Sequence, residues 1–228
     1  IGRSTVKSVV TIHDLVFKVL PKTYPLIDRS IYDLKFRSSC RNANRIIAIS
    51  ESTNKDIMKS YGIASEKIEV IYQSCHPAYY TANEHPDAAG NLDKYDLPSE
   101  FLLYVGTIEP RKNLHTILSA YPYLSADYQI PLVVVGGFRS KAYRAAILQQ
   151  IETYGLAQKT HLIHDLKGQT ALQALYRKAQ MLVYPSFYEG FGLPVAEALL
   201  CKTPVITPNR SSLPEAGGPD SEYVDPTD

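Results

Sequence analysis

Short apolar runs alternate with longer segments of helical spacing along most of the 228 residues. In the first part, β-branched and apolar runs predict strands at residues 8–12, 45–49 and 67–71. Helical spacing covers residues 28–43, and a second helix is expected from a Ser50 or Ser52 cap to about residue 61, before Gly62. This order predicts a parallel sheet with right-handed crossovers.

A second series of the same kind begins after residue 100. Its apolar runs predict strands at residues 101–106, 132–135, 160–164, 181–184, 204–207 and 222–224, and the spacing between them predicts helices at 113–121, 142–154, 170–179 and 194–200. The strands are mostly apolar, as strands covered on both faces should be. We therefore predict an α/β protein with two Rossmann-like, doubly wound parallel-sheet domains, the first of them partial.

The periodicity fails between the two series. Residues 73–100 hold Pro77, Pro86, Gly90 and Pro98 among polar residues, a composition typical of a linker. The predicted organisation is an N-terminal domain over residues 1–75, a linker over 76–100 and a C-terminal domain over 101–228.

Composition narrows the class of protein. Hydrophobic residues make up 45%, charged residues 21%, and the net charge is +1, so neither nucleic acid nor an anionic membrane is expected as the main partner. Cys40, Cys75 and Cys201 form no CxxC pair, and the six histidines show no metal-ligand spacing. We expect no disulfide and no metal site, a buried Cys201 and a cytoplasmic location.

One stretch combines strand, glycine-rich loop and helix. After the apolar run 181–184, Pro185 ends the strand, the loop contains Gly190-Phe191-Gly192, and Pro194 suits the first turn of a helix. Such a unit places loop amides and a helix N-terminus at the carboxyl edge of a sheet, where open α/β folds bind ligands. Glu189 and Glu197 flank the glycines. Each also has a structural explanation, Glu189 as a solvated loop residue and Glu197 as a first-turn acid that complements the helix dipole.

The loop after residue 106 is the second candidate. It reads Gly106-Thr-Ile-Glu-Pro-Arg111-Lys112-Asn113 and sets two adjacent cations at the start of a predicted helix. Adjacent cations are often plain surface charge. At a helix start, however, they oppose the macrodipole, and a bound phosphate would remove that conflict.

These two loops together resemble the signature of retaining, GT-B-fold glycosyltransferases of family four. The likeness rests on Glu189, seven residues and Glu197 around Gly-Phe-Gly-Leu-Pro, and on the Arg111-Lys112-Asn113 segment, and it extends over nearly the whole chain. It implies sugar transfer from a nucleotide-diphosphate sugar by a front-face mechanism, with no metal, no enzyme nucleophile and no cofactor besides the donor substrate.

The resemblance also assigns roles to residues of this chain. Arg111 and Lys112 would grip the diphosphate, Glu189 the hydroxyls of the transferred sugar, and Glu197 the ribose. By the same likeness His13, at the end of the first strand, faces the cleft. Ser50 carries less weight because helix capping already explains it. The remaining donor-binding residues that the likeness implies are Gly106, Gly190, Phe191, Gly192, Leu193, Thr207 and Ile163.

The partners implied are a nucleotide-sugar donor and a glycan or lipid-linked acceptor. Compared with the family, the chain lacks the first part of the N-terminal domain and the C-terminal return helix. We expect the acceptor-binding loops, and any peripheral contact with the inner face of the membrane, to belong to the missing N-terminal part. Two alternatives stay open: a donor-binding fragment or scaffold without turnover, and another GT-B-like enzyme such as a sugar-nucleotide epimerase or a phosphorylase.

Overall fold

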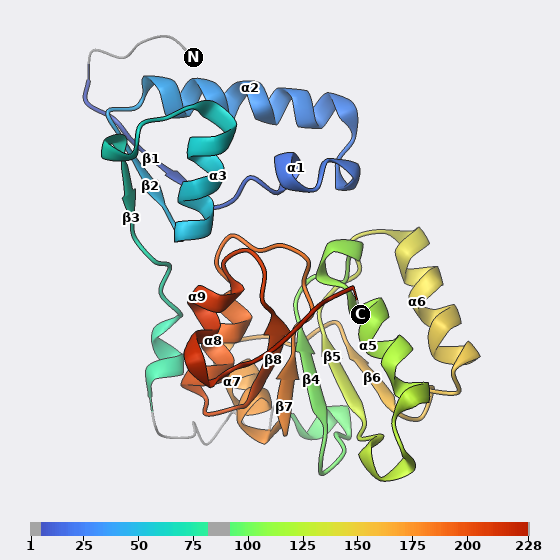
Figure 1. The fold of residues 1–228 in the computed structure, drawn as a ribbon. Helices are drawn as coiled ribbons and strands as arrows, with labels where there is room; N and C mark the ends of the chain where they lie inside the picture. Colours follow the sequence, from blue (N-terminus) through green and yellow to red (C-terminus); the bar gives the residue numbers. More distant parts are fainter. Residues whose placement is uncertain (1–5, 82–91, 228) are drawn as a thin grey trace. The chain divides into compact units, whose positions relative to one another are not determined.

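The computed structural model describes residues 6–81 and 92–227 (Figure 1). The chain divides into two compact units. The first contains Ile1–Ser74 together with Tyr188–Gly192 and Arg210–Ala216, and the second contains Cys75–Phe187, Leu193–Asn209 and Gly217–Asp228. Of the predicted linker, residues 82–91 lie outside the described residues. Within the described part of the chain, no helix combines the length and apolarity that a membrane span needs.

The first unit is built on a three-stranded parallel sheet. Its strands are β1 (Val9–Ile12), β2 (Arg45–Ala48) and β3 (Ile68–Val70), in the order β1-β2-β3. The connections contain α1 (Val16–Val19), α2 (Leu26–Asn42) and α3 (Glu51–Tyr61). Gly62 ends α3 in the left-handed conformation, as the sequence predicts. The core of this unit includes Ile12, Phe17, Ile46 and Ile57.

The second unit is built on a six-stranded parallel sheet of order β6-β5-β4-β7-β8-β9. Its strands are β4 (Leu102–Val105), β5 (Leu132–Val135), β6 (Thr160–Ile163), β7 (Met181–Val183), β8 (Val205–Pro208) and β9 (Glu222–Val224). The helices are α5 (Leu114–Ala120), α6 (Lys141–Thr153), α7 (Gln169–Lys178) and α8 (Leu193–Leu200). Every strand and helix expected from the sequence is present, with ends moved by one or two residues.

Two short helices were not predicted. They are α1 and α9 (Leu213–Gly217), with only four and five residues. Helices this short span little more than one turn and therefore show no hydrophobic periodicity. Several single turns of 3-10 helix likewise escaped the sequence pattern, among them Pro110–Lys112, which forms part of the candidate site.

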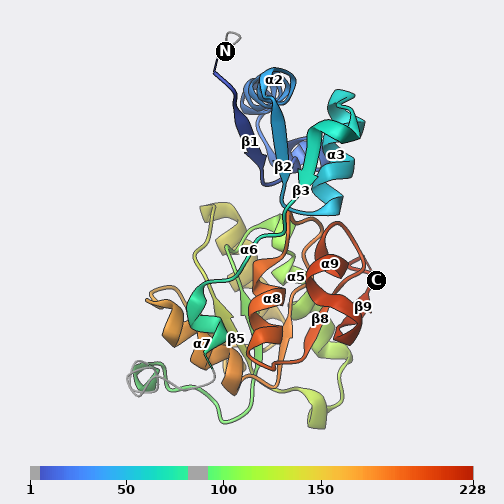
Figure 2. The same cartoon turned by 90° about the vertical axis from the view of Figure 1, so that its left-hand side faces the viewer.

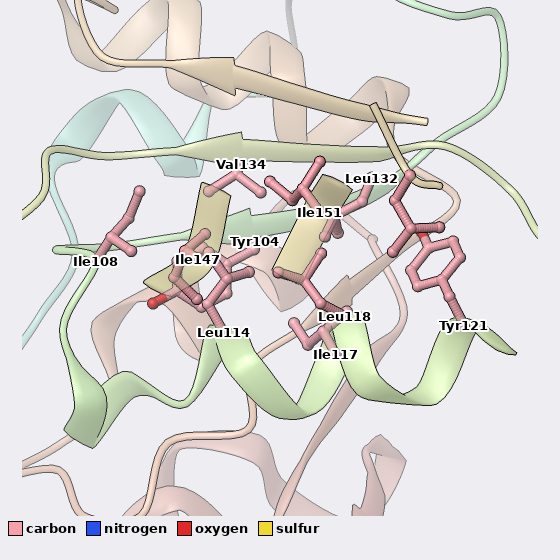
Figure 3. Packing of buried hydrophobic residues seen from close by; sticks show 11 residues of the cluster. Tyr104, Ile108, Leu114, Ile117, Leu118, Tyr121, Leu132, Val134, Ile147 and Ile151 are labelled. Atoms are coloured by element: carbon pink, nitrogen blue, oxygen red, sulfur yellow. The ribbon is translucent and has the colours of Figure 1, made fainter. Parts of the chain in front are cut away.

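Both faces of the second sheet are covered. Tyr104 and Val134 point to one face, where α5 and α6 bury them beneath Leu118 and Ile147 (Figure 3). The alternate residues of the same strands, such as Leu103, are also fully buried. Because successive strand residues point to opposite faces, this double burial explains why the strands are apolar throughout.

Helix α6 offers a matched test of this packing. Ile147 is 1% exposed within the core, whereas its neighbour Leu148 is 39% exposed. We expect Ile147→Ala to lower the free energy of unfolding by about 2–5 kcal/mol, through lost burial and the cavity left behind. Leu148→Ala should lower it by less than about 1 kcal/mol. Urea unfolding followed by circular dichroism measures both, and equal losses would contradict the assignment of this helix face.

Candidate functional site

The loop that follows β4 is shaped by two glycines. Gly106 has φ of +139°, a backbone conformation that favours glycine, and its amide donates to the carbonyl of Val135 on the neighbouring strand at 2.9 Å. A Cβ at Gly136 would lie 2.0 Å from the Gly106 carbonyl oxygen. The ends of β4 and β5 therefore approach more closely than side chains would allow. The loop then forms the 3-10 turn Pro110–Lys112, and α5 begins one residue later.

Arg111 is held in this loop by a buried carboxylate. Its guanidinium lies 2.7 Å from Oε1 of Glu109, and the other oxygen of Glu109 pairs with Arg139 at 2.9 Å. Glu109 is only 6% exposed, so its charge requires such partners. The sequence did not mark Glu109, whose role as the anchor of Arg111 depends on the turn that folds it back.

Lys112 lies deeper. It is 9% exposed, its ammonium donates to the hydroxyl of Tyr184, and the same nitrogen lies 5.0 Å from the centre of that ring. Tyr184 is fully buried just after β7. Two further bonds reach Arg111: the amide of Phe187 donates to its carbonyl at 2.9 Å, and so does the hydroxyl of Ser186 at 3.3 Å. The loop after β4 and the loop after β7 are thus joined at one carboxyl edge.

Glu197 does not lie in the first turn of its helix, which corrects the structural explanation given above. Helix α8 begins at Leu193, so Glu197 is its fifth residue, beyond the reach of a first-turn dipole effect. The half-buried carboxyl accepts a hydrogen bond from Tyr176 at 2.9 Å. Burial raises the pKa of Glu197, while the hydrogen bond from Tyr176 acts in the opposite direction.

Three of the predicted donor-binding residues serve the fold as well. Thr207 is fully buried, and its hydroxyl donates to the Tyr184 carbonyl at 3.1 Å. The carbonyl of Ile163 accepts the Gly136 amide at 2.9 Å, which ties β6 to β5. Leu193 is half-buried as the first residue of α8. All three lie in the second unit, with Gly106, Arg111, Lys112 and Glu197.

The remaining predicted residues belong to the first unit, which groups the segment 188–192 with His13. The backbone explains Gly190: a Cβ there would lie 2.1 Å from the carbonyl oxygen of His13. Gly190 has no positive φ, so lack of space alone excludes a side chain. The His13 side chain is exposed, whereas Phe191 is buried with its ring 5.8 Å from that of Tyr72. Gly192 has φ of +104°.

Ser50 has two functions at this loop. Its side chain caps α3 by accepting from the Thr53 amide at 3.0 Å, and its hydroxyl donates to the Gly190 carbonyl at 2.7 Å. The capping explanation was therefore correct but incomplete. Thr53 also reaches the Gly190 carbonyl, at 3.3 Å.

Glu189 is held through its backbone. Its amide donates to the hydroxyl of Ser211 at 3.0 Å, and its carbonyl accepts from Ser212 at 2.9 Å. The neighbouring Tyr188 donates to Asp56 at 2.6 Å. No local pattern marks these supporting residues, because they are separated from the loop by 22 to 132 positions. The Glu189 side chain is 9% exposed, so it is not the solvated loop residue that the structural explanation assumed.

All three cysteine side chains are buried, as expected for Cys201, and none of them forms a disulfide. Among residues 6–81 and 92–227, no group of three or more His, Cys, Asp or Glu side chains is placed to hold a metal ion.

Two family models match this chain. Residues 93–223 match the model described as Glycosyl transferases group 1, and residues 1–77 match that of Glycosyltransferase Family 4. The O-antigen chain mannosyltransferase B of Escherichia coli is 31% identical over 226 residues, covering 97% of this chain and 58% of that protein. The O-antigen chain mannosyltransferase RfbU of Salmonella typhimurium is 28% identical over 221 residues, covering 96% and 57%. The chain thus spans a little over half the length of these relatives.

Solved structures show the same fold. Anabaena Alr3699/HepE in complex with UDP and glucose is 20% identical, with a TM-score of 0.73 over 92% of this chain and 54% of that one. A glycosyltransferase from Rickettsia africae ESF-5 is 20% identical, with a TM-score of 0.77 over 99% and 58%. The predicted GT-B type of α/β fold is therefore confirmed.

The close approach at Gly190 is testable by adding one methyl group. Gly190→Ala should lower the free energy of unfolding by about 1–3 kcal/mol, because the new Cβ displaces the His13 backbone. Gly137→Ala is the control, since a Cβ there meets no atom within 4 Å. It should change stability by less than about 0.5 kcal/mol. If Gly190→Ala unfolds at the same urea concentration as Gly137→Ala, the loop does not lie against the backbone of His13.

The raised pKa of Glu197 makes its contribution to stability depend on pH. Between its ordinary value of 4.5 and its raised value, the folded state binds more protons than the unfolded state. Stability is therefore lost as pH rises through this window. We expect Glu197→Gln to be more stable than the wild type at pH 7.5, with a smaller difference at pH 4. Glu152→Gln, at an exposed position of α6, is the control for the same chemical substitution on the surface. Urea midpoints measure both, and a pH-independent difference would contradict a raised pKa.

Proposed function

Because this chain belongs to the glycosyl transferases group 1 family, we propose that it binds the nucleotide-sugar donor in a retaining glycosyltransferase that transfers mannose. The observation that carries the proposal is the joining of the Arg111–Lys112 loop to the loop after β7 at one carboxyl edge. Open parallel sheets bind their ligands at this edge. The choice of mannose follows the two mannosyltransferase relatives.

The charges of the second unit suit a diphosphate. Arg111, Lys112 and Arg139 stand around the loop, and Glu109 pairs with both arginines. Arg111 and Lys112 would hold the diphosphate of the donor and stabilise the nucleoside diphosphate that leaves. Glu197 would accept hydrogen bonds from the ribose hydroxyls, because a carboxylate is an acceptor for both members of a diol.

The residues of the first unit take the sugar in this proposal. Glu189 would accept hydrogen bonds from the hydroxyls of the transferred sugar, next to the amides of Gly190, Phe191 and Gly192. His13 would face the donor or acceptor sugar. These assignments extend the family likeness to residues that the structure fixes firmly: Gly190 by its close approach to His13, and Glu189 by its two serine contacts.

The reaction proceeds on one face of the sugar. The acceptor hydroxyl oxygen bonds to the anomeric carbon as the bond from that carbon to the phosphate oxygen breaks. The departing phosphate accepts the proton of the hydroxyl, so the products are a glycoside of retained configuration and a nucleoside diphosphate. Neither a metal ion nor a covalent enzyme intermediate takes part. The proposed acceptor is a growing glycan or a lipid-linked sugar, as in the assembly of O-antigen chains by the named relatives.

A second hypothesis is that this chain by itself binds the donor without turnover. It is favoured by the length of the match, which covers 58% of the first relative. Release of nucleoside diphosphate from a nucleotide sugar, measured with and without acceptor glycans, separates the two hypotheses. Binding without release supports the second one, and acceptor-dependent release supports the enzyme.

Nucleotide binding is the first test of the proposal. Calorimetric titration with GDP, UDP, ADP and their sugars should reveal one base that binds. Arg111→Ala should weaken that binding by about 10- to 100-fold, since it removes a charged hydrogen-bond donor to phosphate. Arg144→Ala is the matched control, because Arg144 is an exposed arginine of α6 in the same unit. Absence of binding by any nucleotide, or equal affinities for both variants, would contradict the proposal.

A further inference from the structure

One polar contact of the second unit joins α7 and α8, which lie side by side in both views (Figures 1 and 2). The hydroxyl of Tyr176, on α7, donates to Oε2 of Glu197, on α8, at 2.9 Å. Tyr176 has no exposed surface, whereas Glu197 is only half-buried. One end of this contact is thus enclosed by protein, and the other reaches toward solvent.

We propose that Tyr176 is a positioning residue that orients the Glu197 carboxylate toward the ribose of the donor nucleotide. The inference rests on the proposed function, because Glu197 binds ribose only if the chain binds a nucleotide. A long, flexible glutamate side chain loses rotamer freedom when it binds a ligand. A hydrogen-bond partner that already fixes the side chain reduces the entropy that is lost on binding.

Tyr176 is itself held in place from several directions. Its carbonyl accepts from the Thr203 hydroxyl at 2.6 Å, which ties the end of α7 to the segment before β8. The ring of Tyr79 packs edge-on against it, with the ring centres 6.0 Å apart. Tyr79 is fixed in turn, since its hydroxyl donates to Gln169 at 2.8 Å. A hydroxyl so enclosed requires its hydrogen bond, because leaving it unpaired costs about 1–3 kcal/mol.

The surroundings also act on the protonation states of the pair. Burial raises the pKa of Tyr176 well above 10, so the phenol remains a donor at neutral pH. Burial also raises the pKa of Glu197, and the hydrogen bond from Tyr176 opposes part of that effect by stabilising the ionised acceptor. The other titratable groups that act on this carboxyl or its tyrosine partners are the phenol of Tyr184 and the thiols of Cys75 and Cys201. Burial raises the pKa of each thiol to about 11, so neither adds charge at neutral pH.

The oxygens of Glu197 then have separate roles. Oε2 accepts from Tyr176 inside the protein. The remaining lone pairs of the carboxylate are left to accept from ligand hydroxyls. Removing the phenol oxygen should therefore weaken the hold on ribose and leave the hold on phosphate intact.

The test compares Tyr176→Phe with the wild type on two ligands. The ligands are the nucleoside diphosphate that binds best and its 2′,3′-dideoxy form, titrated by calorimetry. The wild type should bind the dideoxy form about 10-fold or more weakly, since it lacks both hydroxyls. Tyr176→Phe should weaken binding of the ribose form by about 3- to 10-fold and leave binding of the dideoxy form unchanged.

Tyr121→Phe is the matched control. Tyr121 is also buried in the second unit, and its hydroxyl donates to the Ile130 carbonyl at 2.7 Å. Both variants lose one internal hydrogen bond, so urea unfolding should show comparable losses of stability. Only Tyr176→Phe should change the ratio between the dissociation constants of the two ligands. In a Glu197→Gln background, Tyr176→Phe should have a smaller effect on that ratio.

Two outcomes would overturn the inference while the proposed function stands. In the first, the wild type binds nucleotide and discriminates against the dideoxy form, but Tyr176→Phe leaves the ratio unchanged. In the second, Tyr176→Phe weakens both ligands equally, which is the result of a purely structural role. If the folded wild type binds no nucleoside diphosphate, the proposed function fails and the inference falls with it.

Discussion

Parallel pairing of β4 with β7 is the constraint on which the second unit depends. Leu102 pairs with Met181 and Leu103 with Leu182, although two strands (β5 and β6) and three α-helices (α5, α6 and α7) lie between them in the sequence. This pairing brings the loops after both strands to one edge, where Phe187 and Ser186 bond to the carbonyl of Arg111. Without it, the cations and the helix that carries Glu197 would have no common edge.

Several charged groups of the second unit have specific polar partners, and Glu109 and Lys112 among them are buried. Glu109 is enclosed between Arg111 and Arg139, Lys112 lies against Tyr184, and Glu197 lies against Tyr176. Buried charges reduce stability unless they are well paired, and hydrophobic side chains of similar size would serve the fold as well or better. Each of these groups is therefore stabilised in the fold by a specific partner. The raised pKa of Glu197 shows that burial of this carboxyl disfavours its charged form.

The glycine loop of the first unit shows a different kind of constraint. The chain leaves one compact unit at residue 188, contributes five residues to the other, and returns at residue 193. Within those five residues, Gly190 is required by the backbone of His13, and the Glu189 backbone is held by Ser211 and Ser212. The position of this loop is thus fixed by contacts of its backbone. Such contacts do not depend on the identity of most side chains, but they leave no room for a Cβ at Gly190.

The sequence by itself determined the strands, the longer helices, the fold class and the two candidate loops, but not the short helices α1 and α9. Apolar runs such as 132–135 and glycine stops such as Gly62 are local signals, because strand and helix periodicity are properties of neighbouring residues. The tertiary structure alone decided which partners fix the candidate residues. Glu109 anchors Arg111, Tyr176 meets Glu197, and Ser50 reaches Gly190 across 140 positions. The last two contacts arise only when the tertiary structure brings distant segments together, whereas the Glu109–Arg111 pair depends on the 3-10 turn that folds this loop back.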